Sequence, residues 1–178
     1  MTTRIFTRAT LHGLTLSMVA ALAIAAMPRA FAADASGLLR PATDLSLQGA
    51  SLLLEQAITK ATTDHVHPCI AIADASGNLL AFKRMDGAPP GCVRAAIKKA
   101  NSAAINGVDT VVFYDLARQQ NLQLGSIPGI LPAVAGVVIR QQGEAVGSLG
   151  IAGGAGDAQE QQFASDLVRT FEKSLPAR

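Results

Sequence analysis

The run Arg84-Met85-Asp86 has the clearest binding chemistry in the sequence, and it directly follows a predicted apolar hairpin. In an extended chain, Arg84 and Asp86 share one side while Met85 faces the other. The fork of donors on arginine suits a carboxylate or a propionate, and Lys99 could provide a second anion contact. Alternatively, Arg84 pairs with Asp86, the aspartate caps the turn at Gly87, and Lys99 is a solvated charge.

His65 and His67 are the two histidines that follow the first 32 residues. Imidazoles two positions apart can both face a metal when the backbone is extended, and Asp64 or Cys69 could add a third ligand. We therefore consider His65 and His67 as ligands of a metal or of haem iron. The alternative is a solvated connector in which both histidines are simply polar.

Cys69 and Cys92 would meet an oxidising compartment after export, where such a pair is often bridged. In the chain-entropy model the closed loop would stabilise the fold by roughly 3 kcal/mol. Alternatively, Cys69 packs as a small buried hydrophobe and Cys92 is exposed. No spacing favours Cys92 as a nucleophile, and the glycines between 147 and 154 match neither a Walker loop nor a dinucleotide fingerprint.

The N-terminus has the composition of an export signal. Arg4 and Arg8 precede an apolar run over 14–26, and Ala30-Phe31-Ala32 is an A-x-A cleavage pattern. The apolar run is shorter than the roughly 20 residues that a membrane-spanning helix needs. We predict a cleaved signal peptide over 1–32 and a periplasmic or secreted protein; an uncleaved tether is the alternative.

Residues 33–178 have the length of one domain with a real core. The formal net charge of +2 includes three arginines of the predicted signal, so the remaining chain carries about −1. Aromatic residues make up 4% of the sequence, there is no tryptophan, and no basic stripe is present. This composition argues against a protein that binds nucleic acids.

Hydrophobic periodicity sets the expected order of elements. Apolar residues recur at helical spacing in three segments, and two pairs of short apolar runs separated by turn residues predict β-hairpins. Hairpins imply antiparallel pairing, so we expect an α+β fold in the order α-β-β-α-β-β-α, with helices packed on an antiparallel sheet. A short helix near 114–121 is less clear. The predicted segments are helix 47–61, strands 69–73 and 79–83, helix 93–104, strands 134–140 and 144–151, and a helix from 157.

Several of these segments together resemble the GlcG/HbpS family, also called the DUF336 domain and found fused in PduO-type proteins. The resemblance covers about residues 45–175. The residues that carry it are Ile70-Ala71-Ile72-Ala73-Asp74 with Gly77, Arg84-Met85-Asp86-Gly87-Ala88-Pro89, Lys99-Ala100 with Ala103-Ala104, and Gly143, Gly147, Gly150 and Gly153.

The resemblance implies a central antiparallel sheet of about five strands with helices on its faces, assembled into dimers or larger oligomers. It also implies binding of a small ligand. Some members bind haem, and one secreted branch serves as a redox and haem sensor that interacts with a sensor kinase. Others stand beside glycolate or diol metabolism.

Among the candidate residues, Arg84, Met85, Asp86 and Lys99 match family motif positions, and Thr110 is a weaker match. His65 and His67 occupy a variable position, so their role as ligands rests on their chemistry alone. The chain departs from the family before its third predicted strand. There the family tends to have a glycine pair followed by a small residue and proline, and this sequence has Ala133-Val134-Ala135-Gly136.

Our leading hypothesis is an exported protein that binds haem or a related tetrapyrrole, in redox sensing or haem handling. Its pocket would be formed by the first hairpin, the following helix and the glycine-ending fourth strand. The alternative is an accessory protein or enzyme for a small 2-hydroxy or keto acid, with Arg84 binding the carboxylate and Asp86 as base. A third is a structural or signalling protein whose oligomer is the active species.

Overall fold

The computed structural model describes residues 42–119 and 121–177. The predicted signal peptide over 1–32 lies outside this range. Within it, no helix combines the length and the apolar character that crossing a membrane would require. The fold is formed by the compact unit that begins at Thr43.

The fold is built on four antiparallel strands in the spatial order β2-β1-β4-β3. Two hairpins, β1–β2 and β3–β4, lie side by side, and their inner strands β1 and β4 pair along the centre of the sheet. The antiparallel sheet is confirmed, with four strands in the described residues where the resemblance implied about five. The strands are β1 Cys69–Asp74, β2 Leu79–Arg84, β3 Gly136–Gln141 and β4 Glu144–Ala152.

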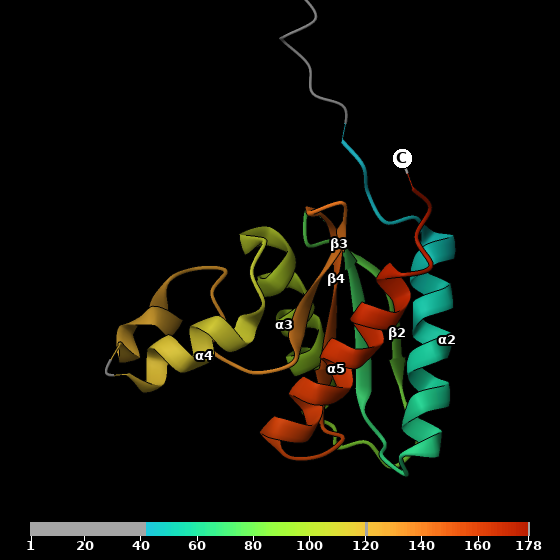
Figure 1. Cartoon of the computed structure of the whole chain (residues 1–178). Helices are drawn as coiled ribbons and strands as arrows, with labels where there is room; N and C mark the ends of the chain where they lie inside the picture. The colour runs from blue at the N-terminus through green and yellow to red at the C-terminus, as the bar shows by residue number, and fades with distance from the viewer. Residues whose placement is uncertain (1–41, 120, 178) are drawn as a thin grey trace, which may run out of the picture. The chain divides into compact units, whose positions relative to one another are not determined.

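Helices cover both faces of this sheet (Figure 1). Helices α2 (Leu47–Thr63) and α5 (Asp157–Glu172) pack on one face, and α3 (Cys92–Asn106) packs on the other. Between α3 and β3 the chain forms helix α4 (Thr110–Arg118) and the 3-10 helix η4 (Leu122–Ser126), which lie beside the sheet. The order α-β-β-α-β-β-α did not include α4, but a short helix was expected near 114–121. Helix α4 begins four residues earlier, at Thr110.

The main core lies between the sheet and the pair α2 and α5. Ser46 caps α2 by accepting a hydrogen bond from the backbone N–H of Gly49 at 3.1 Å. The apolar residues of both helices recur every three or four positions, so they form stripes that pack against the sheet. The buried set includes Leu53, Leu54, Ala57, Ile70, Ile72, Leu149, Ile151, Phe163, Leu167 and Phe171.

Helix α3 approaches the other face so closely that only small side chains fit between them. A Cβ added to Gly136 would lie 2.5 Å from the carbonyl oxygen of Lys99, and one added to Gly150 would overlap the backbone at Ala96. The disulfide between Cys69 and Cys92 fastens the start of α3 to β1, with a Cα–Cα distance of 5.5 Å. The bridged alternative for the two cysteines is therefore the one that the structure has.

Strand β3 is an edge strand whose outward N–H groups are all occupied by side chains. Three side-chain oxygen atoms, from Asp109 and Thr110 at the start of α4 and from α5, accept these hydrogen bonds. The bonds are Gly136 N to Thr110 Oγ1 at 2.9 Å, Val138 N to Asp109 Oδ1 at 2.8 Å, and Arg140 N to Glu172 Oε1 at 2.6 Å.

Candidate functional site

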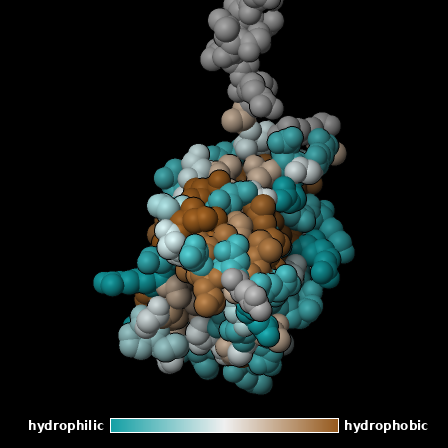
Figure 2. All heavy atoms as spheres, turned by 90° about the vertical axis from the view of Figure 1, so that its left-hand side faces the viewer, coloured by the Kyte–Doolittle hydropathy of each residue, from teal (hydrophilic) through white to brown (hydrophobic). Residues whose placement is uncertain are grey.

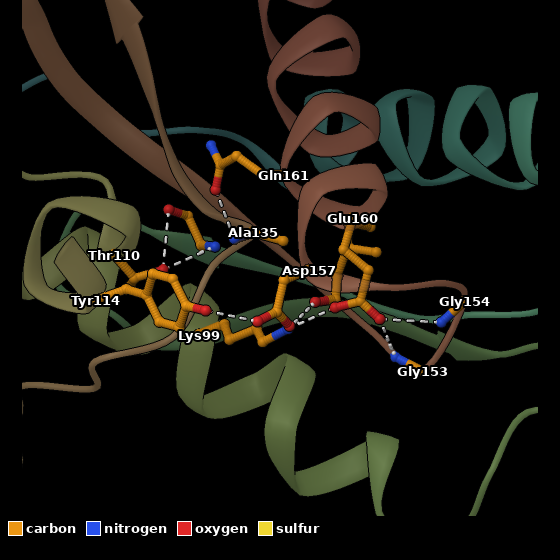
Figure 3. Close-up of polar contacts among 11 residues, drawn as sticks. Lys99, Thr110, Tyr114, Ala135, Gly153, Gly154, Asp157, Glu160 and Gln161 are labelled. Carbon is orange, nitrogen blue, oxygen red and sulfur yellow. Dashed lines mark hydrogen bonds and ion pairs between the residues drawn. The ribbon is translucent and has the colours of Figure 1, made fainter. Parts of the chain in front are cut away.

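A buried ion pair joins α3 to α5 at the end of β4 (Figure 3). The Nζ atom of Lys99 lies 2.8 Å from Oε2 of Glu160 and donates a second hydrogen bond, at 2.7 Å, to the carbonyl oxygen of Ile151. Each of the two charged residues is only 7% exposed. The alternative that Lys99 is a solvated charge is therefore wrong, because Lys99 is buried and paired with Glu160.

The other carboxylate oxygen of Glu160 holds the glycine turn that follows β4. Oε1 accepts hydrogen bonds from the backbone N–H groups of Gly153 at 2.6 Å and Gly154 at 3.1 Å. Gly153 has φ = +79°, and a Cβ there would collide with the side chains of Cys92 and Pro89. The carboxylate is thus fully hydrogen-bonded, as a buried charge must be to be tolerated.

Thr110 and Tyr114 connect α4 to the same region (Figure 3). Thr110 is fully buried, with its hydroxyl bonded to the backbone of Gly136, so it serves the fold here. The Tyr114 hydroxyl donates a 2.8 Å hydrogen bond to Oδ2 of Asp157 in the first turn of α5. This hydrogen bond stabilises the protonated phenol, so the pKa of Tyr114 is raised above its ordinary value.

The departure from the family pattern before β3 coincides with a left-handed residue. Ala135 has φ = +65°, and its N–H donates to Oε1 of Gln161 at 2.7 Å. A residue with a Cβ avoids this conformation, which suits glycine. Ser165 in turn accepts a hydrogen bond from Nε2 of Gln161 at 2.9 Å. We call Lys99, Glu160, Gln161, Tyr114, Asp157 and their hydrogen-bonded partners the polar cluster.

Glu160 and Gln161 were not among the residues predicted from the sequence, although the sequence pattern held a signal for Glu160. Glu160 precedes Phe163 by three positions and lies on the apolar stripe of α5 that continues through Leu167. A carboxylate on an apolar stripe needs a buried cation, and Lys99 is that cation. The role of Gln161 depends on the backbone of Ala135 and had no counterpart in the sequence pattern.

The remaining predicted residues meet at the same end of the sheet, where β2 ends and β1 begins. Arg84 stands opposite Cys69 in the strand register, and the N–H of Met85 donates to the carbonyl oxygen of Pro68 at 3.2 Å. His67 is exposed, and its ring is the nearest group to a Cβ built at Gly87, 3.9 Å away. We call His67, Arg84, Met85 and Asp86 the sheet-end rim.

Within the rim, the guanidinium of Arg84 is bonded to the carbonyl oxygen of Ala88 through Nε at 3.2 Å and Nη2 at 2.7 Å. The expected alternative, an ion pair between Arg84 and Asp86, is not formed among the described residues. Arg84 keeps its Nη1 donors for a ligand, but part of its fork holds the turn. Met85 is half-buried, and Asp86 is exposed.

His65 lies apart from the rim. It is exposed, has φ = +55°, and follows the last turn of α2. Cys69 is bridged and Asp64 is paired with Lys60 at 2.8 Å, so neither joins the histidines. In the part of the chain that the structure describes, no group of three or more histidine, cysteine or carboxylate residues is arranged to hold a metal ion.

A cavity of about 180 Å³ adjoins the polar cluster on the α2 and α5 side of the sheet. The predicted pocket involved α3 and β4, which approach each other so closely at Gly150 that a Cβ there would overlap the backbone of α3. In the connector between α2 and β1, residues 64, 66 and 68 line the cavity while His65 and His67 are exposed. The lining includes the apolar residues Val66, Pro68, Ile151 and Phe163 and the charged residues Lys60, Asp64, Glu160 and Asp166.

Large apolar side chains gather on the surface around α4. Figure 2 shows this face of the molecule, with a broad hydrophobic patch at its centre. Monomeric proteins rarely expose wide apolar patches unless a partner binds there. We call the set the apolar α4 surface; its members are Ile105, Val112, Leu116, Leu122 and Ile127, which are 44–84% exposed.

Comparisons with known proteins agree with this architecture. Protein GlcG of Escherichia coli K12 is 29% identical over 107 residues, which cover 60% of this chain and 80% of GlcG. The crystal structure of a double mutant of Streptomyces reticuli HbpS has a TM-score of 0.68 at 29% identity, covering 75% of this chain and 91% of that one. The structure titled "PduOC:Heme Complex" shares the fold, with a TM-score of 0.64 at 24% identity over 71% of this chain and 94% of its own.

The model of one protein family matches residues 45–169 and is described as "Haem degrading protein HbpS-like". The match includes the whole sheet, α2, α3, α4 and all but the last residues of α5. Because this match covers well over half of the sequence, this chain belongs to the HbpS-like family.

Proposed function

We propose that this protein binds haem or a related tetrapyrrole at the sheet-end rim. The observation that carries the proposal is that His67, Met85 and Arg84, which carry an imidazole, a thioether and a guanidinium, lie at one end of the sheet. Histidine and methionine are axial ligands of haem iron, and arginine binds carboxylates such as propionates. Membership of the HbpS-like family and the fold shared with a haem complex support the proposal.

The residue types at the rim suit haem, whereas the volume of the cavity beside Glu160 does not. Pockets that enclose a drug-sized ligand have volumes of about 300–1,000 Å³. The cavity beside Glu160 has about 180 Å³, which is too small for a tetrapyrrole. At the rim, His67 or Met85 would hold the iron of haem, and the Nη1 donors of Arg84 would be available for a propionate. The bound group would supply the redox chemistry of its iron.

A haem group bound on the surface of one chain would have one face exposed to water unless a second copy of the chain covered it. We propose that the protein forms a homo-oligomer, and the apolar α4 surface supports this. Light scattering tests the idea: Leu116→Glu should lower the molar mass in solution, and Glu55→Gln, on the exposed side of α2, should leave it unchanged. An unaltered mass in Leu116→Glu would remove this surface from the assembly.

We also propose that the protein is exported and works in haem handling or redox sensing outside the cytoplasm. The buried bridge between Cys69 and Cys92 supports an oxidising compartment, since such bridges persist there. The signal pattern in residues 1–32 points the same way.

A hemin titration followed in the Soret region tests the binding proposal. The chain has one tyrosine and no tryptophan, so quenching of Tyr114 fluorescence gives an independent second signal. We expect one saturable site that His67→Ala or Met85→Ala weakens, with His65→Ala as the matched control from the same connector. A nonsaturable response would refute haem binding. Equal affinities in the His67, Met85 and His65 variants would refute the rim as its site.

A further inference from the structure

The cavity beside the polar cluster has an aromatic wall that already holds a cation of this chain. The Nζ atom of Lys60, in the last turn of α2, lies 5.2 Å from the centroid of the Phe163 ring. The same Nζ lies 2.8 Å from Oδ2 of Asp64. An ammonium group over an aromatic face and next to a carboxylate is the arrangement by which proteins recognise organic cations.

The other charges around the cavity favour a positive ligand. Glu160 is neutralised by Lys99 and has both oxygens occupied. Asp166 accepts a hydrogen bond from Gln162 at 2.8 Å and meets Arg169 at 3.3 Å, yet its side chain is still 38% exposed. Lys60 is the one cationic residue among the described residues that line the cavity. When its ammonium group moves away, the carboxylates of Asp64 and Asp166 remain in the lining without a cation from the lining itself.

The lining also contains apolar residues that suit a short hydrocarbon. Val66, Pro68 and Ile151 form the wall next to Phe163. A volume of about 180 Å³ accommodates a ligand with a handful of heavy atoms. The lining thus has Phe163 and Asp64 to contact an ammonium group and apolar residues to contact a tail of a few carbon atoms.

We infer that this cavity is a second binding site, which takes a small alkylammonium cation. The ligand's ammonium replaces that of Lys60 over the Phe163 ring and beside Asp64, and its tail packs on Ile151. Lys60 is displaceable because its ion pair with Asp64 is an i,i+4 pair whose side chains are 35% and 38% exposed. Its long flexible stem allows the head to move into solvent. The inference is independent of haem binding at the rim.

The sign of the Lys60 effect separates this proposal from the opposite one. If the ammonium group of Lys60 occupies the position that a cationic ligand would take, replacing Lys60 strengthens binding of that ligand. If Lys60 instead attracts an anion such as a small carboxylate, with the start of α5 as a second favourable group, its removal weakens binding. The two ligand classes therefore respond in opposite directions to one substitution.

The test uses n-butylammonium chloride and sodium butyrate as probes at equal ionic strength. The amide resonances of Gly154 and Ala155, which line the cavity, report binding in two-dimensional NMR spectra. We expect saturable shifts with butylammonium and none with butyrate. Lys60→Ala should tighten binding by about threefold or more, and Phe163→Leu should weaken it by a similar factor. Lys173→Ala, an exposed lysine at the end of α5, controls for the change in net charge.

Asp64→Asn serves as a second variant, since it leaves the core residue Phe163 in place and should also weaken butylammonium binding. Butyrate binding that is lost in Lys60→Ala would overturn the cation assignment. The absence of saturable shifts with both probes in the folded wild-type protein would overturn the site itself. Neither outcome bears on the hemin titration, so the two proposals fail separately.

Discussion

We expect the free energy of unfolding to depend strongly on the buried ion pair between Lys99 and Glu160. Lys99→Met leaves the Glu160 carboxylate buried without a cation, while its Oε1 atom still accepts from Gly153 and Gly154. Breaking a buried pair by removing one partner costs about 3–5 kcal/mol, because the remaining charge has no compensation. A domain of ordinary stability has about 5–15 kcal/mol in total, so this loss is large.

The double variant tests the cause of that loss. In Lys99→Met/Glu160→Gln no charge is buried, and the glutamine oxygen can still accept from the glycine turn. We expect the double variant to be more stable than Lys99→Met, with a coupling free energy of about 1–3 kcal/mol in the mutant cycle. The exposed neighbour Lys98→Met is the matched control and should change stability by less than about 0.5 kcal/mol.

Urea unfolding followed by circular dichroism supplies the free energies, provided that the slope against denaturant stays constant among the variants. A cost below about 1 kcal/mol for Lys99→Met would refute the view that the cluster is a desolvated ion pair. So would free-energy losses that simply add in the double variant. In either case Lys99 would have access to water or to another anion.

Three further predictions concern single contacts. Ala135→Gly should raise the free energy of unfolding by a few tenths to about 1 kcal/mol, because glycine relieves the left-handed strain at φ = +65°, whereas Ala133→Gly should not; urea unfolding decides. Tyr114, the single tyrosine, should titrate above its ordinary pKa by absorbance, and Asp157→Asn should bring the pKa down. Because the folded pKa is raised, the contribution of this contact to stability is present below about pH 10 and is lost as pH rises through the folded value; a Tyr114 pKa unmoved by Asp157→Asn would contradict this. Cys92→Ser should cost roughly 3 kcal/mol in thermal or urea unfolding, from the 23-residue separation that the bridge closes, and an unchanged stability would contradict the closed loop.

Much of the fold could be predicted from periodicity because its elements bury regular stripes. The stripe of α5 through Phe163, Leu167 and Phe171 sits on the sheet, and both hairpins end in the turn residues that the sequence shows. The short helix expected near 114–121 stood outside the predicted order, whereas helix α4 spans Thr110–Arg118. Thr110 is its single buried residue, so α4 adds little to the core that organises the other elements, and Val112 and Leu116 are exposed.

The candidate site was predictable only in part, because its contacts join distant segments. Arg84, Met85 and His67 were identified by chemical type, and the strand register brings them to one end of the sheet. Lys99 was identified too, but its partner Glu160 lies 61 positions away. Which face of the connector is turned inward depends on where α5 packs, and no local pattern at His65 encodes that.

The capped edge of β3 limits how copies of this protein can associate. An edge strand with free N–H groups is a template on which another strand can pair, and the sheet can then extend from molecule to molecule. Here Thr110, Asp109 and Glu172 occupy those groups, so backbone pairing at β3 would first have to break three side-chain bonds. These hydrogen bonds oppose growth of the sheet into a fibre through the β3 edge. Copies that associate at this edge must do so through side-chain contacts, which are compatible with an assembly of finite size. Loss of Glu172 or Asp109 would leave the isolated fold intact and yet make concentrated solutions prone to aggregate.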